Sequence, residues 1–317
     1  MVARSAAGSP GGVPRVVIGA PASGHGKTTV ATGLTAAFTR RGVRVAPFKV
    51  GPDYIDPGYH ALAAGRPGRN LDPFLVGEER VAPLFRHGSQ AADLAIVEGV
   101  MGLYDGAVGR GEFASTAHVA RLIGAPVVLV VDATAQGRSI AALVHGFRSF
   151  DPAVRIAGVI LNRVGSQRHR EILTDALDGV GVPVLGALYR DDAVAAPSRH
   201  LGLVPVAERA PAALAAVDAL ADLAAASIDL AAVDRSARGC DPLPPGRWTP
   251  ADEVGEPNPA RPLVAIAAGA AFTFSYAENA ELLTAAGATL APFDPLQQER
   301  LPEGTSALVI GGGFPEV

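Results

Sequence analysis

The amino-acid sequence predicts an α/β protein in which a parallel sheet carries helices on both faces, followed by the start of a second α/β unit. Three observations lead to this fold class. Short runs rich in Val and Ile alternate with Ala-rich segments of helical periodicity. Several runs are almost entirely apolar, which is typical of strands buried on both faces. Finally, a stretch dense in Pro, Gly and charge, residues 236–262, separates two such series.

The first series begins with a buried strand, RVVIGA, over residues 15–20. A helix follows from about Thr28, with apolar residues on one face, until Gly42 closes it. Five more apolar runs predict further strands, with helices plausible between several of them, over residues 43–50, 93–100, 125–132, 155–164 and 182–188. This order of strands and helices favours a parallel sheet with helices on both faces.

After residue 262 the pattern restarts, with apolar runs at 263–272, 288–293 and 306–317 and a helix around 278–287. These are too few strands to close a core, so we expect the chain to stop inside this second unit. The predicted organisation is a disordered tail over 1–14, a first domain over 15–235, a linker over 236–262 and part of a second domain over 263–317.

Composition narrows the setting. With 317 residues and 49% hydrophobic content the chain can bury a large core. Its 27 basic residues are scattered and are outnumbered by 31 acidic ones, which argues against nucleic acid as a partner. The apolar stretches are too short, or are broken by Asp, to cross a membrane. A single cysteine, Cys240, excludes an internal disulfide and fits a reducing cytoplasm.

The strongest chemical motif is ASGHGKTTV, residues 22–30, between the first strand and the first helix. Its backbone N–H groups would curl around phosphate oxygens, helped by the positive end of the helix. Lys27 would neutralise the β- and γ-phosphates, and the Thr28 hydroxyl would bind magnesium. The motif is a variant, since Pro21 stands where the opening glycine of a P-loop belongs. The alternative is a Gly-rich turn with a capping Ser or Thr.

Acidic residues follow two of the predicted strands. Asp53 and Asp56 lie in PFKVGPDYIDPGYH, residues 47–60, and Glu98 and Asp105 lie at the end of DLAIVEGVMGLYDG. Strand ends face the nucleotide in such folds, so these acids are candidates for the metal and for the substrate. Magnesium needs only one or two carboxylates. Taken alone, the first stretch is also ordinary turn chemistry.

The motifs FKVGPDYIDPGYH, RNLDPF, IVEGVMGLYDG, GVILNRVGSQRH and GGGFPE, in this order behind ASGHGKTTV, resemble those of the cobyrinic acid a,c-diamide synthase family of cobalamin biosynthesis. The resemblance runs from about Val16 to Val317. It implies a P-loop NTPase-type, dethiobiotin-synthetase-like domain that activates corrinoid carboxylates with ATP and Mg²⁺, and a class I glutamine amidotransferase domain that supplies ammonia. The motifs do not separate cobalt-free hydrogenobyrinic acid from cobalt-containing cobyrinic acid.

Residue roles follow from the motifs and the resemblance together. We expect Asp53 to join Thr28 and Glu98 at the metal, while Asp56 and Asp105 serve the substrate carboxylate and its acyl phosphate. Lys27 is the third residue predicted to be catalytic. The loop residues Gly24, His25, Gly26, Lys27, Thr28 and Thr29 would hold the phosphates of the nucleotide. Asn162 is the residue predicted to contact adenine. Four residues are candidates for the substrate wall, although the three aromatic ones could equally serve packing: Tyr54, Tyr59, Asn70 and Tyr104.

Two departures from the family pattern stand out. Gly269 replaces an aspartate that often begins the GAAFTFSY stretch, and the glutaminase cysteine does not occur before the chain stops after GGGFPEV. We therefore expect free ammonia, but not glutamine, to support amidation by these residues.

The expected partners are a corrinoid polycarboxylic acid and glutamine or ammonia, without nucleic acid or membrane, and a homodimer is left open. A dethiobiotin synthetase and a partitioning-type regulatory ATPase remain as alternatives. The first has no reason to carry the linker and GGGFPE, and the second lacks GPDYIDP.

Overall fold

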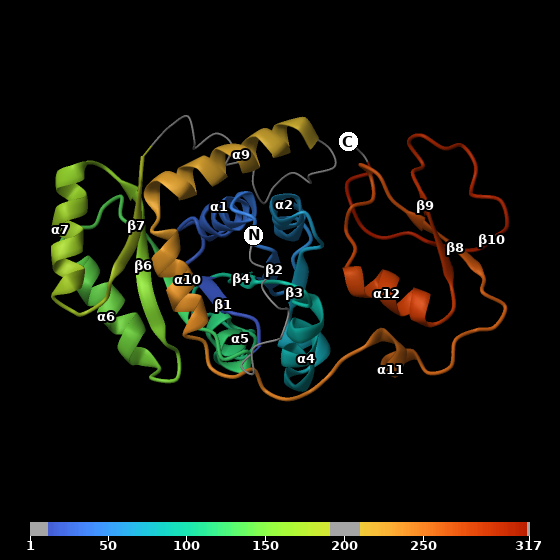
Figure 1. Ribbon diagram of the computed structural model, residues 1–317, viewed down its shortest axis with the longest axis horizontal. Helices are drawn as coiled ribbons and strands as arrows, with labels where there is room; N and C mark the ends of the chain where they lie inside the picture. The colour runs from blue at the N-terminus through green and yellow to red at the C-terminus, as the bar shows by residue number, and fades with distance from the viewer. Residues whose placement is uncertain (1–11, 191–209, 316–317) are drawn as a thin grey trace, which may run out of the picture.

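A computed structural model describes residues 12–190 and 210–315, so residues 1–11 of the predicted tail and the last two residues of the GGGFPEV segment lie outside it (Figure 1). The first unit is built on a seven-stranded sheet in the order β3-β2-β4-β1-β5-β6-β7, and every neighbouring pair is parallel. The strands are β1 Arg15–Gly19, β2 Val45–Val50, β3 Arg69–Leu71, β4 Leu94–Glu98, β5 Val127–Asp132, β6 Ile156–Val164 and β7 Val184–Tyr189. The predicted α/β fold class is confirmed.

Six of these strands correspond to the apolar runs in the sequence, and β3 does not. It has only three residues, RNL, and pairs with β2 alone at the edge of the sheet. Neither its length nor its composition distinguishes it from a loop, so the sequence did not predict it.

Helices cover both faces of the sheet because alternate strand residues point to opposite sides. Val16 and Ile18 pack with α1 Lys27–Arg40, α9 Ala210–Ser227 and α10 Leu230–Arg238. Val17 packs in the other layer, whose helices are α4 Glu78–Gly88, α5 Thr116–Leu122, α6 Ile140–Phe150 and α7 Gln167–Asp178. Two shorter helices, α2 Asp56–Ala64 and α3 Pro73–Val76, flank β3 in the chain. No helix in the described ranges is long and apolar enough to cross a bilayer.

The second unit is a three-stranded parallel sheet in the order β10-β8-β9. Its elements are β8 Leu263–Ala267, α12 Ala277–Ala285, β9 Thr289–Phe293 and β10 Thr305–Val309. It lies beside the β3 edge of the first sheet, with α12 turned toward α4 (Figure 1).

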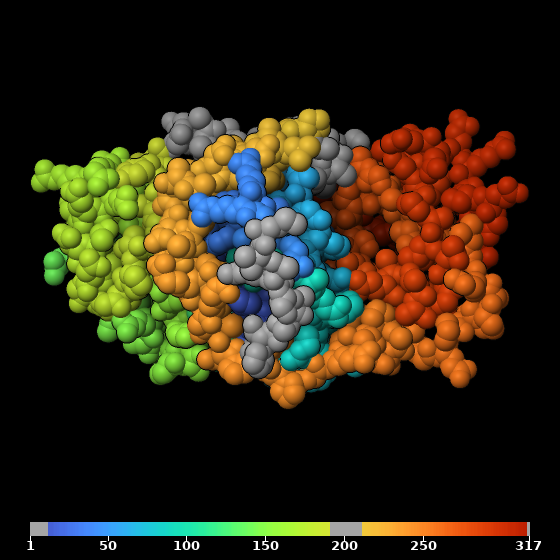
Figure 2. Space-filling view, in the orientation of Figure 1, coloured from blue at the N-terminus to red at the C-terminus, as the bar shows by residue number. Residues whose placement is uncertain are grey.

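The stretch predicted as a linker is not uniformly extended. It contains a short helix, α11 Pro250–Val254, and the side chain of Trp248 is buried in the core of the first unit. Figure 2 shows the orange residues of this segment along the lower edge of the first unit.

The strand order brings three carboxyl ends together. β4 lies between β1 and β2, so the loop after β1, the end of β2 and the end of β4 meet at one place. Lys49 of β2 and Ile18 of β1 are both register partners of Glu98 in β4. Ile18 packs against α1, and register partners point to the same face of the sheet. Lys49 and Glu98 therefore point toward the start of that helix.

Candidate functional site

The loop between β1 and α1 has a backbone shape that only glycine adopts easily. Gly24 and Gly26 have φ angles of 81° and 98°. A Cβ atom on Gly26 would lie 2.2 Å from Nδ2 of Asn162, so this position also lacks space for a side chain. Lys27 then begins α1, and Thr28 and Thr29 follow half-buried in its first turn. The motif therefore forms a tight turn, and the N-terminus of α1 points toward the concave side of this loop.

A side chain of β6 and a backbone N–H of the neighbouring strand β5 support this loop. The Asn162 amide, at the end of β6, donates to the carbonyl of His25 at 2.8 Å. The backbone N–H of Asp132 donates to Nδ1 of His25 at 2.9 Å. Burial lowers the pKa of His25, which agrees with a neutral ring that accepts at Nδ1. In this structure Asn162 braces the loop; its contact with adenine stays a prediction.

Lys27 is 8% exposed and turns back over the loop. Its ammonium donates to the carbonyls of Ala22, at 3.2 Å, and of Met101. Burial lowers its pKa to about 8. A phosphate beside Nζ would favour the charged form, so the side chain is suited to an anionic ligand.

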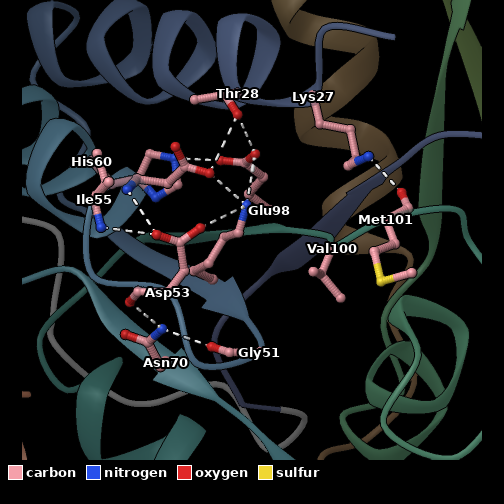
Figure 3. A network of polar contacts seen from close by, with 12 residues as sticks. Lys27, Thr28, Gly51, Asp53, Ile55, His60, Asn70, Glu98, Val100 and Met101 are labelled. Carbon is pink, nitrogen blue, oxygen red and sulfur yellow. Dashed lines mark hydrogen bonds and ion pairs between the residues drawn. The ribbon is translucent and has the colours of Figure 1, made fainter. Parts of the chain in front are cut away.

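Next to the loop lies a group of polar residues, of which Thr28 is half-buried and the others are buried, and we call it the carboxylate cluster: Thr28, Lys49, Asp56, His60 and Glu98 (Figure 3 labels Thr28, His60 and Glu98). The Thr28 hydroxyl donates to Oε1 of Glu98 at 2.6 Å and lies 3.4 Å from Oδ2 of Asp56. The Lys49 ammonium contacts both carboxylates, at 2.6 Å to Oδ2 of Asp56 and 3.0 Å to Oε1 of Glu98. One cation thus lies between two buried acids.

The surroundings in the cluster shift the pKa values of Lys49, Glu98 and Asp56. Burial opposes the charge of Lys49, but Glu98 and Asp56 together raise its pKa above its ordinary value. Burial also opposes the charge of Glu98, yet Lys49 and His60 lower its pKa to about 2. For Asp56, burial first and the Glu98 charge second raise the pKa to about 6. The pKa values of Asp56 and Glu98 lie below 7, so both carboxylates are mainly charged at neutral pH beside the Lys49 ammonium.

The oxygen atoms of the carboxylate cluster decide whether it suits Mg²⁺. Among the described residues no group of three or more His, Cys, Asp or Glu is arranged as a metal site. Magnesium, however, keeps several waters and needs one or two carboxylates. The Thr28 hydroxyl adjoins Glu98, and Oδ1 of Asp56 is buried without a hydrogen-bond partner within the described chain. The donor set fits Mg²⁺ with few protein ligands.

Asp53 and Asp56 are arranged differently from the sequence-based prediction. Asp53 was expected beside Thr28 and Glu98, but the structure brings Asp56 there. Oδ1 of Asp53 accepts from the backbone N–H groups of Ile55, at 2.8 Å, and Asp56, at 3.1 Å, and its Oδ2 lies 3.6 Å from the ammonium of Lys49. The reason is local: Asp53 closes the turn before α2, whereas Asp56 sits in its first turn and faces the cluster. A metal role for Asp53 stays a prediction.

Two residues of the cluster were missed from the sequence. Lys49 was hidden inside an apolar strand, and only the register that pairs it with Glu98 gives it a partner. His60 lies four residues after Asp56, so both are on one face of α2. Its Nε2 is 2.7 Å from Oε2 of Glu98, within ion-pair distance, although the atoms are not aligned as a hydrogen bond. The Asp56–His60 spacing was the available signal.

Asp105 lies on the loop after β4. Its Oδ2 accepts from the N–H of Gly102 at 2.9 Å, and its charge is one of those that favour the protonated form of Lys27. The acid thus lies on the loop whose Met101 carbonyl accepts from Lys27 (Figure 3 labels Lys27 and Met101). Its role toward the substrate stays a prediction.

The four predicted wall residues occupy different surroundings. Tyr104 donates to the carbonyl of Phe147 at 2.7 Å, and burial raises its pKa to about 12. Tyr59 is 5% exposed in a cluster that α2 forms with α9. The Asn70 amide donates to the carbonyls of Gly51 and Asp53, each at 2.7 Å. These contacts serve packing and loop anchoring, so their predicted substrate roles remain untested.

Tyr54 differs because it lines an open cleft between the two units. The cleft has a volume of about 310 Å³, and its lining is mainly apolar: Val50, Pro52, Asp53, Tyr54, Ile55, Val100 and Phe274. The Tyr54 ring stacks on Tyr276 and Phe274, with centroids 4.6 and 5.1 Å apart. Of the four predicted wall residues, Tyr54 is the one that borders this cleft.

Comparison with known proteins gives a consistent result. The family described as "CobQ/CobB/MinD/ParA nucleotide binding domain" matches residues 16–204. Hydrogenobyrinate a,c-diamide synthase of Streptomyces coelicolor is 59% identical over 96% of this chain and 69% of its own length. The Mycobacterium tuberculosis protein of that name is 58% identical over 96% and 67%. Cobyrinate a,c-diamide synthase of Gloeobacter violaceus is 47% identical over 95% and 65%.

Proposed function

The chain belongs to the family of hydrogenobyrinate and cobyrinate a,c-diamide synthases, and on this premise we propose that it amidates the a and c carboxylates of hydrogenobyrinic acid with ATP. Over the aligned residues, the two relatives named above for the cobalt-free substrate are 58–59% identical to this chain, against 47% for the Gloeobacter violaceus protein named for cobyrinate. Cobyrinic acid is therefore the second candidate substrate. Because these relatives match 95–96% of this chain, dethiobiotin synthetase and partitioning-type ATPase are no longer candidate functions.

The observation that carries the mechanism is the contact of Thr28 with Glu98 and Asp56 beside the phosphate loop. This arrangement supports a nucleotide bound with its phosphates in the loop and its terminal phosphate next to the carboxylate cluster. Bound Mg²⁺, held by Thr28 and Glu98, would screen the charge of the terminal phosphates.

The reaction then proceeds in two balanced steps. A carboxylate oxygen of the corrinoid attacks the γ-phosphorus of ATP, and the bond between the γ-phosphorus and the β-phosphate oxygen breaks. ADP departs as the leaving group, and the corrinoid carboxylate has become an acyl phosphate. Lys27 contributes its positive charge where negative charge gathers during this transfer. Ammonia next attacks the acyl carbon, inorganic phosphate departs, and the nitrogen loses a proton to give the amide. Asp56 or Asp105 orients the ammonia or accepts that proton.

The family implies glutamine as the nitrogen donor, and hydrolysis of glutamine releases ammonia. Free ammonia attacks the same acyl phosphate without that hydrolysis. A homodimer stays a prediction.

The test supplies the protein with ATP, magnesium and ammonium chloride and follows amide formation on each corrinoid acid by mass spectrometry. We expect ATP-dependent diamide formation from hydrogenobyrinic acid, and its loss in Lys27→Ala with the fold intact, because the charge is needed when the phosphoryl group moves. Arg238→Ala, which removes an exposed ion pair with Asp234, is the matched control. Turnover of Lys27→Ala at the control rate would refute the proposed site.

A further inference from the structure

The two units are joined by a partly buried group of ion pairs around Arg69. Nη1 of Arg69, in β3, lies 2.6 Å from Oε1 of Glu278 in α12, and its other amino group contacts Glu281 of the same helix. Nε2 of His87, in α4, lies 2.9 Å from Oε2 of Glu281. The Arg69 side chain is 11% exposed, so this group is shielded from water and weakens little with salt.

The neighbour of Arg69 holds the loop that carries the two aspartates. Asn70 is the register partner of Lys49, and its amide donates to the carbonyls of Gly51 and Asp53. Asp53 in turn accepts from the N–H of Asp56 and sets the start of α2. A short series of contacts thus leads from α12, through β3, to the carboxylate cluster.

A second contact joins the units at the same loop. Tyr54, between the two aspartates, stacks on Tyr276, which directly precedes α12. The residues around Gly51–Asp56 therefore touch the second unit through Tyr54 and are linked to it through Arg69 and Asn70.

β3 by itself is poorly stabilised. It has three residues and one strand neighbour, and such edge segments open with little cost in free energy. Arg69 adds contacts from outside the first unit. Removing them should loosen β3 and, through Asn70, the loop.

We propose that Arg69 is a positioning residue: its ion pairs with Glu278 and Glu281 couple the second unit to the geometry of the carboxylate cluster. The inference rests on the proposed function only in taking that cluster as the reaction site. It implies that displacement of α12 changes the site without any contact between α12 and nucleotide.

Hydrogen exchange of the whole chain, without corrinoid, tests this coupling. Two variants break the ion pairs from opposite sides: Arg69→Leu in β3, and the double substitution Glu278→Gln with Glu281→Gln in α12, which removes both carboxylate partners of Arg69. The control is Arg44→Leu, which breaks an exposed pair with Asp93 at the opposite end of β2. Exchange of the Ile55 and Asp56 amides is the first readout, exchange of β5 is the internal reference, and calorimetric affinity for Mg·ATP is the second readout.

We expect both variants to exchange Ile55 and Asp56 about fivefold faster and to bind Mg·ATP about fivefold more weakly, with β5 and the control unchanged. Unchanged exchange and affinity in the Glu278→Gln, Glu281→Gln double variant would overturn the proposal, and this conservative variant decides the matter if Arg69→Leu does not fold. A failure of the unaltered protein to make diamide would instead count against the proposed function and leave the exchange result standing.

Discussion

At the residue scale, Lys49 is the most consequential side chain of the site. It is 4% exposed, and its ammonium lies between Asp56 and Glu98. Two buried carboxylates that are both close enough to contact one ammonium repel each other strongly unless that cation lies between them. Lys49 therefore offsets the repulsion between the two acids and keeps them close together.

Replacing Lys49 by Met should lower the free energy of unfolding by about 3–5 kcal/mol, because a buried charge pair loses one partner. Urea unfolding without magnesium measures this change. We chose Arg40→Met for comparison, since it breaks exposed pairs with Asp218 and Asp222 and should cost about 1 kcal/mol or less. Equal losses for the two variants would show that Lys49 does not neutralise the cluster.

At the element scale, the β1–α1 loop is determined by backbone shape and by one neighbouring strand. Gly26 has a positive φ and, in addition, faces Asn162 of β6 at a distance that excludes a Cβ atom. Gly42, after α1, has a positive φ of 79° but open space around it. Comparing substitutions at Gly26 and Gly42 therefore distinguishes the effect of backbone strain, present at both, from the effect of the contact with Asn162, present only at Gly26.

Both Gly26→Ala and Gly42→Ala should lose about 1 kcal/mol of stability through the strained backbone. Only Gly26→Ala should also lose nucleotide binding, because the loop must move away from Asn162 and its N–H groups then no longer converge. Titration calorimetry with ATP, beside urea unfolding of each variant, checks both statements. Normal ATP affinity in Gly26→Ala would mean that the loop does not bind the phosphates.

At the scale of the whole molecule, the segment after α10 belongs physically to the first unit. The N–H of Asp241 donates to the carbonyl of Gly124 at 2.9 Å, and Arg86 donates to the carbonyl of Pro244 at 2.7 Å. Trp248 is 6% exposed and packs edge-on against His87. Residues 240–249 thus form a strap on the first unit, and only the chain after them leads away to the second.

Trp248→Ala should therefore destabilise the first unit by about 3–5 kcal/mol, the usual cost of emptying a large buried site. Arg247→Ala, at an exposed neighbouring position, should change stability by about 0.5 kcal/mol or less. Thermal unfolding of both variants provides the measurement. If Trp248→Ala unfolded at the temperature of the Arg247 variant, the segment would be a free tether, as the Pro- and Gly-rich sequence alone suggested.

The sequence by itself determined the features written in contiguous residues. Continuous apolar runs predicted six of the seven strands of the first sheet, and nine adjacent residues predicted the phosphate loop, because local spacing dictates both. The ordered motifs also led to the family. Only the tertiary structure decided which acid stands beside Thr28, because Asp53 and Asp56 fit the same pattern and differ only in how the turn before α2 directs them. It alone placed Lys49 opposite Glu98 and Arg69 opposite α12, since strand register and the packing of distant segments fix those contacts and neither is readable from neighbours in the chain.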